Sequence, residues 1–120
     1  MVSRVTEKGD AFVRMRLDRH GTSMIQRAVP LDPAWKSVAV SWCLRANDVK
    51  PGDKDYETPV VQVIFRNATG EHVGGWLAKL KVGKDADWHE QQQRYVVPEG
   101  AASVVLQIFM LDCAGTFDVD

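Results

Sequence analysis

Residues Ala102–Leu111, with the sequence ASVVLQIFML, decide the fold class of this chain. One face of this segment carries the apolar residues Val104, Leu106, Ile108 and Met110. Gln107 and Phe109 fall on the other face. Alternation with a period of two residues is typical of a β-strand that buries one side against a core. We therefore predict a strand here, and a sheet around it.

Seven further segments have a similar character, and Gly, Pro and Asp residues separate them. They are Ala11–Leu17, Met24–Val29, Ser37–Ala46, Val60–Asn67, Trp76–Val82, Glu90–Val97 and Thr116–Asp120. No segment has the pattern of an amphipathic helix. Seven or eight short strands with turn signals between them predict an all-β fold, an antiparallel two-sheet β-sandwich or jelly roll.

Length and composition limit the classes of protein. The chain has 120 residues, which suits one domain (1–120) with one core. A net charge of -1, with Lys and Arg scattered along the chain, argues against nucleic acid as a partner. No apolar run is long enough to span a bilayer, so no membrane partner is expected.

The ends and the cysteines leave two questions open. The first residues, MVSRVTEKGD, contain no signal peptide, so the chain is either cytosolic or part of a longer exported protein. The final segment Thr116–Asp120 is short for a closing strand, which favours a module excised from a larger multidomain enzyme. Cys43 and Cys113 could form one disulfide or remain two buried thiols.

Motifs for catalysis are missing from the sequence. His20, His72 and His89 have no second ligand at metal-binding spacing, and no metalloprotease, nucleophile-elbow or phosphate-loop motif occurs. The acidic residues near Trp88 are more typical of a solvated loop than of a catalytic pair. We expect no enzyme.

Four tryptophans in 120 residues instead suggest carbohydrate binding. An aromatic ring covers the apolar face of a pyranose, and Gln, Asn or Arg side chains bond its hydroxyl groups. Trp76 follows Gly74 and Gly75, which cannot shield its ring, and Tyr56 lies in a long polar loop. Trp42 shares a face with core residues, so it would contact a ligand only if that face is open. Trp35 and Trp88 precede strands and fit packing roles.

Four stretches taken in order carry a family resemblance. They are VPLDPAWKSVAVSWCLRA (Val29–Ala46), VIFRNATGEHVG (Val63–Gly74), DWHEQQQRYVVPEGAASVVLQI (Asp87–Ile108) and AGTFDVD (Ala114–Asp120). Together they resemble bacterial carbohydrate-binding modules with a galactose-binding-like β-sandwich, which accompany glycoside hydrolases. The resemblance extends over about residues 7 to 120.

The resemblance implies a glycan groove across a concave sheet or at loop tips. The expected sugar contacts are Trp76, Tyr56, Trp42, Gln62, Gln107 and Arg45. It further implies a structural calcium ion held by Asp118 of the last strand, with Glu7 as a weak second acid. The expected partners are a β-linked plant cell-wall polysaccharide, such as cellulose-like chains, mixed-linkage glucan or xyloglucan, and an attached catalytic domain of an extracellular enzyme. β-Mannan and xylan would stack similarly.

Two alternatives remain on sequence grounds. The chain could be a structural β-sandwich spacer within a larger enzyme, with all its tryptophans packed and no glycan binding. A small hydrolase would need a catalytic carboxylate pair, and no pair in the sequence stands out for that role.

Overall fold

The computed structural model describes residues 1–77 and 80–120, and these form eight β-strands joined by turns and loops. The strands are β1 (Val2–Glu7), β2 (Asp10–Pro30), β3 (Ser37–Lys50), β4 (Pro59–Arg66), β5 (His72–Val73), β6 (Leu80–Lys81), β7 (Ala86–Val96) and β8 (Ser103–Val119). Every strand pairing among them is antiparallel. The predicted all-β antiparallel sandwich is confirmed.

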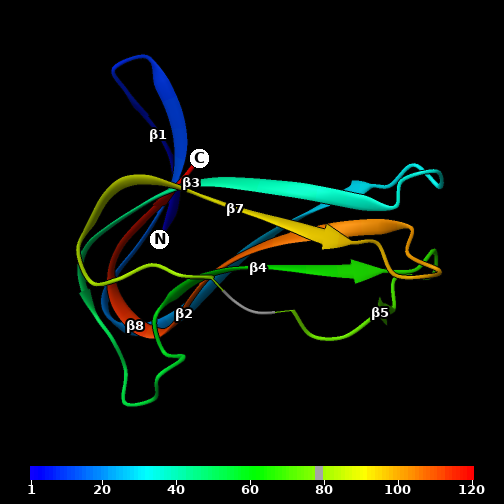
Figure 1. Cartoon of the computed structure of the whole chain (residues 1–120). Coiled ribbons are helices and arrows are strands. Elements are labelled where there is room, and N and C mark those ends of the chain that lie inside the picture. The colour runs from blue at the N-terminus through cyan, green and yellow to red at the C-terminus, as the bar shows by residue number, and fades with distance from the viewer. Residues whose placement is uncertain (78–79) are drawn as a thin grey trace.

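Two long strands, β2 and β8, build both layers of the sandwich (Figure 1). The first layer has the order β1, first half of β2, end of β8, β3, β7. The second layer consists of the second half of β2, the first part of β8, and β4, with β5 and β6 on the outer edge of β4. Strands that pass from one sheet to the other through bulges are a known way to make the corner of a sandwich. β8 is therefore the central strand of both layers.

The strand boundaries differ from the predicted ones at the corner, where β2 and β8 pass from one layer to the other. A turn was expected between Leu17 and Met24, and the segments on either side of Asp112 were expected to be separate strands. Instead β2 and β8 run on through register shifts at Gly21, because both strands bend together. Gly115 supports the bend with a φ of 125°, and a Cβ on it would lie 2.8 Å from the Val49 Cα. Only glycine fits there.

Two strands were missed at the sequence level, and one segment lies partly outside the described residues. β1 carries the mixed sequence VSRVTE, and β5 has only two residues, so neither gives a clear alternation signal. Of the predicted strand Trp76–Val82, residues 78–79 lie outside the described residues. The part that is described includes β6, which pairs with β4.

The core lies between the layers and follows the predicted alternation, except that Val60, Ile64 and Val105, on the opposite face of β4 and β8, are buried as well. Its buried members include Met15, Leu44, Val61, Val63, Phe65, Val104, Met110, Phe117 and Val119. Neighbouring residues on the same strands, such as Gln62 and Asp118, consequently point to the outer faces.

Neither cysteine forms a disulfide. Cys43 is exposed and Cys113 is buried, and both are free thiols. Burial raises the pKa of the Cys113 thiol to about 11. Among the described residues, no helix has the length and apolar character needed to cross a bilayer.

Candidate functional site

A row of three glutamines crosses the outer face of the second layer. Gln62 on β4 lies opposite Gln107 on β8, and Gln107 lies opposite Gln26 on β2. The Gln107 Nε2 donates a hydrogen bond of 3.0 Å to the Gln26 Oε1. We call these three residues the amide row. Two of them, Gln62 and Gln107, were predicted as sugar contacts, and the structure brings them side by side.

The amide row is open at one end and has unused hydrogen-bonding capacity. Gln26 is exposed, whereas Gln62 and Gln107 retain 5% and 8% exposure. In the described part of the chain, the Gln62 side chain makes no hydrogen bond. A glutamine amide offers two N–H donors and one carbonyl acceptor. The row can therefore bond further polar groups, such as hydroxyls, where its amides reach the surface, at Gln26 and over the small exposed part of Gln62.

Trp76 is presented on the same face as the amide row. His72 on β5 pairs with Arg66 on β4. Arg66 lies an even number of residues from Gln62 on the same strand, so the side chains of Gln62, Arg66 and His72 point to the same outer face of the second layer. The Trp76 indole stacks on the His72 imidazole, with ring centroids 4.2 Å apart and an angle of 16° between the planes. Trp76 therefore has one ring face backed by histidine, and 76% of its surface remains exposed.

The two glycines before Trp76 have different roles. Gly74 has a φ of 80°, and a Cβ there would lie 3.1 Å from the Pro98 side chain, so the backbone passes close to the loop after β7. A Cβ on Gly75 would meet nothing within 4 Å. The chain thus turns tightly at Gly74, and no neighbouring group crowds Gly75 beside the indole.

Tyr56 lies in the loop between β3 and β4 and is 50% exposed. The Lys54 ammonium lies 5.7 Å from its ring centroid. Within the described residues, no recorded ring contact joins Tyr56 to Trp76. The structure therefore leaves Tyr56 as a separate exposed aromatic at the start of β4.

Trp42 does not belong to this surface, which corrects its proposed position among the exposed sugar contacts. It is 5% exposed and packs in the core, as its alternation with Val38, Val40 and Leu44 had suggested. Trp88 also packs, as expected: its ring meets Phe12 edge-on, with centroids 5.1 Å apart.

Arg45 lies in the other layer, where it forms a second row with Arg14 and Asp118. These three residues are in register on β3, β8 and β2. Asp118 is fully buried and accepts hydrogen bonds from Arg14 Nε at 2.8 Å, from a terminal nitrogen of Arg14 at 3.1 Å, and from Arg45 Nε at 2.9 Å. We call it the charged row. Because Arg45 is committed to this row, it is not available to the amide row.

Glu7 closes the charged row from the β1–β2 hairpin. Two terminal nitrogens of Arg45 donate hydrogen bonds of 3.1 and 3.4 Å to its carboxylate. This hydrogen bonding holds the pKa of the Glu7 carboxyl below its ordinary value of 4.5. The Arg45 guanidinium also lies 4.6 Å from the Trp88 ring centroid. Sequence reasoning singled out Arg45, Asp118 and Glu7, but the structure joins them in one ion-pair network.

The charged row does not fit the expected calcium ion. Calcium needs several oxygen ligands with free lone pairs. Both oxygens of Asp118 already accept from guanidinium groups, and two positive charges stand where a cation would bind. Among the described residues, no group of three or more His, Cys, Asp or Glu side chains has the arrangement of a metal site. Two carboxylates instead offset two arginines.

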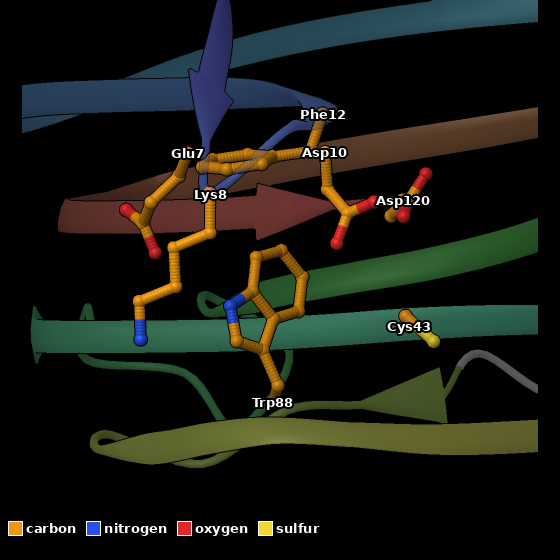
Figure 2. A pocket seen from close by; sticks show the side chains of 7 residues that line it. All are labelled: Glu7, Lys8, Asp10, Phe12, Cys43, Trp88 and Asp120. Carbon is orange, nitrogen blue, oxygen red and sulfur yellow. The ribbon is translucent and has the colours of Figure 1, made fainter.

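Beside the charged row lies a cavity of about 300 Å³, shown in Figure 2. Glu7, Lys8, Asp10, Phe12, Cys43, Trp88 and Asp120 line it. Charged residues of both signs line the cavity with Trp88, and Arg45 and Phe12 both contact its ring. Trp88 therefore offers a poorer stacking platform than Trp76.

No protein-family model and no curated protein sequence matches the chain. Solved structures do. A CBM4 structure matches with a TM-score of 0.67 and 16% identity over 100% of this chain and 73% of the other. A family 16 carbohydrate-binding module matches with a TM-score of 0.59 and 17% identity over 99% and 81%. The chain has the fold of carbohydrate-binding modules.

Two larger proteins contain the same sandwich. The tailspike protein 4 enzymatically active domain of bacteriophage CBA120 matches with a TM-score of 0.77 and 10% identity, over 99% of this chain and only 16% of the tailspike chain. The xylanase 10B structure of Clostridium thermocellum, with CBM22-1 and GH10 modules complexed with xylohexaose, matches with a TM-score of 0.58 and 19% identity over 100% and 23%. The fold thus occurs both as most of a small chain and as a minor part of a large one.

Proposed function

We propose that the chain is a non-catalytic module that binds polysaccharide on the outer face of the second layer. Trp76 is the stacking platform, and the amide row supplies hydrogen bonds to sugar hydroxyls. The observation that carries the proposal is the exposed Trp76 ring stacked on His72, on the same face as Gln62. The fold shared with carbohydrate-binding modules supports it.

The energetics suit a weak, extended ligand. Stacking one pyranose on an indole removes roughly 100 Å² of apolar surface from water, which contributes about 2–3 kcal/mol. Each well-placed hydrogen bond adds about 1 kcal/mol. After the cost of ordering a flexible chain, affinities of roughly micromolar to millimolar follow.

The preferred ligand is a β-linked plant cell-wall glucan, such as cellulose-like chains, mixed-linkage glucan or xyloglucan. Their equatorial substituents give flat apolar faces that match a flat indole. Xylan is the closest competitor, since xylohexaose is the ligand in the related xylanase structure. In a secreted enzyme, the module would hold an attached glycoside hydrolase near its substrate and raise the effective concentration of polymer.

Affinity electrophoresis against β-glucan, xyloglucan, hydroxyethyl cellulose, xylan and mannan tests the proposal. We expect at least one polymer to retard the protein, and Trp76→Ala to weaken binding at least tenfold, about 1.4 kcal/mol. Trp35→Ala is the matched control, because Trp35 is 49% exposed in the loop between β2 and β3.

Two results would contradict the proposal. If no polymer retards the protein, a structural spacer becomes the better description. If a polymer binds but Trp76→Ala and Trp35→Ala both bind it as tightly as the wild type, the glycan site lies elsewhere.

A further inference from the structure

Strand β7 has a free edge at the end of the first layer. It is the last strand in the order of that layer, and its pairing partner is β3. Gln92, Gln93 and Arg94 are all exposed, although the side chains of consecutive residues alternate between the two faces of a sheet. In the described part of the chain, no backbone hydrogen bond reaches the side of β7 that faces away from β3. This edge is therefore open to another strand.

The hydrogen bonds to β3 determine which backbone groups lie on the free edge. The Val97 N–H donates to the Lys36 C=O at 2.9 Å, so the odd-numbered residues of the regular part of β7 direct their backbone groups toward β3. The even-numbered residues from Glu90 to Val96 consequently direct theirs to the free edge. This segment is about 24 Å long, which is enough for a full partner strand. Asp120 lies on the opposite side of β3, where it bonds to Cys43.

The outer face of this segment carries opposite charges at equal distances from a neutral centre. Glu90 lies two residues before Gln92, Arg94 lies two residues after it, and all three are exposed. The two charges are about 13 Å apart along the strand, which is too far for an ion pair within one chain. Among the residues that the structure describes, neither charge belongs to an ion pair, and Arg94 donates one hydrogen bond of 3.2 Å to the Ser37 hydroxyl.

We propose that β7 pairs with β7 of a second copy of this chain, antiparallel and around a two-fold axis at Gln92. In this register the N–H and C=O of Gln92 bond to the same groups of the other Gln92. Glu90 of each copy then faces Arg94 of the other, so both unpaired charges gain a partner. Val96, which is 81% exposed, comes to lie across from Trp88 of the other copy. A contact that is the same on both copies closes as a dimer.

The charges select both this register and this partner. If one copy moves along the other by two residues, Glu90 and Arg94 both face uncharged residues. If it moves by four, two Glu90 or two Arg94 side chains face each other, and like charges on facing strands oppose pairing. Charges on an edge strand usually prevent association with other strands. A second copy in the proposed register neutralises them, whereas the strand of a different protein has no reason to carry the matching order of charges.

Sedimentation equilibrium of the wild type and of charge variants tests the dimer. We expect the wild type to approach twice the 13.4 kDa mass of one chain as its concentration rises. Arg94→Glu places two acids opposite each other on both sides of the axis and should raise the dissociation constant at least tenfold. Combining it with Glu90→Arg restores opposite charges and should restore the dimer. Arg27→Glu, at an exposed position on β2, is the matched control and should dimerise normally.

Backbone hydrogen exchange provides a measurement on the wild type alone. The N–H groups of Glu90, Gln92 and Arg94 point to the free edge, so they should exchange more slowly at high protein concentration than after dilution. The N–H groups of Gln91 and Gln93 point to β3 in either state, and their exchange should change much less. The dimer leaves the outer face of the second layer free, so monomeric Arg94→Glu should still bind any polysaccharide that the wild type binds.

Three outcomes would overturn the proposed dimer. They are a wild type that keeps the mass of one chain at millimolar concentration, a dimer that Arg94→Glu weakens no more than Arg27→Glu does, and a double variant that fails to restore the dimer lost in Arg94→Glu. If Arg94→Glu does not fold, hydrogen exchange of the wild type still decides the question, because exchange at Gln92 that is independent of concentration contradicts the pairing.

Discussion

The two layers carry polar rows of opposite character at equivalent places. Each row crosses three strands, and each is centred on β8, at Asp118 in the charged row and at Gln107 in the amide row. The charged row is satisfied internally, because every oxygen of Asp118 meets an arginine. Within the residues that the structure describes, the amide row has one internal hydrogen bond, and none uses the Gln62 amide. The difference suggests that the charged row stabilises the fold and the amide row binds the ligand.

The largest expected effect comes from breaking the charged row. Asp118→Ala leaves Arg14 and Arg45 without their shared carboxylate in a partly buried site, and removing one partner of a buried ion pair costs about 3–5 kcal/mol. Since the two arginines keep some exposure, we expect a loss of about 3 kcal/mol in the free energy of unfolding, measured by urea denaturation.

An exposed ion pair serves as the control for Asp118→Ala. Arg16 and Asp18 pair at 3.1 Å with side chains 67% and 82% exposed. Asp18→Ala should change stability by less than about 0.5 kcal/mol. Equal effects of the two substitutions would show that the charged row has no special structural role.

The second expected effect separates binding from stability. Gln62→Leu keeps the side-chain volume and removes an amide that makes no hydrogen bond in the described part of the chain. We expect stability to stay within about 0.5 kcal/mol, whereas polysaccharide binding should weaken about fivefold, or about 1 kcal/mol. Gln92→Leu on β7, an exposed glutamine of the first layer, is the matched control and should bind normally. Equal binding by both variants would remove Gln62 from the site.

The smallest expected effect is the contribution of Glu7 in the charged row to the dependence of stability on pH. Hydrogen bonding from Arg45 lowers the folded-state pKa of Glu7 below 4.5, so the folded chain binds this proton more weakly than the unfolded chain. Its contribution to stability is therefore complete above pH 4.5 and is lost as the pH falls through the lowered pKa. Urea denaturation of the wild type and Glu7→Gln at pH 3 to 6 measures it. The variant should show a flatter decline; parallel curves would contradict the assignment.

The fold could be predicted because alternation is a local signal. Val61, Val63, Phe65, Val104 and Met110 are core residues as expected, and Leu106 and Ile108 are partly buried against the core. The corner of the sandwich was not predictable, because whether Gly21 ends a strand or forms a bulge depends on pairing with β8. For the same reason, four segments that were expected to be separate strands form only two strands, β2 and β8.

The site was only partly predictable for a related reason. Strand parity assigned Gln62 and Gln107 to an outer face, but parity cannot tell one layer from the other. Arg45 was therefore predicted to contact the same sugar ligand as the two glutamines, although its partners are Asp118 and Glu7. Gln26 had the right parity, yet only the register joined it to Gln107. The stacking of Trp76 on His72 depends on the turn at Gly74, which no spacing rule specifies.

We propose that the amide row and Trp76 bind sugar while the charged row does not. The most direct measurement is an NMR titration of ¹⁵N-labelled protein with cellohexaose, and with xylohexaose as the competitor, following side-chain signals of both rows. We predict shifts of the Trp76 indole and the amides of Gln26, Gln62 and Gln107, with the Nε signals of Arg14 and Arg45 unmoved. Shifts concentrated at Arg14, Arg45 and Trp88 would contradict the account.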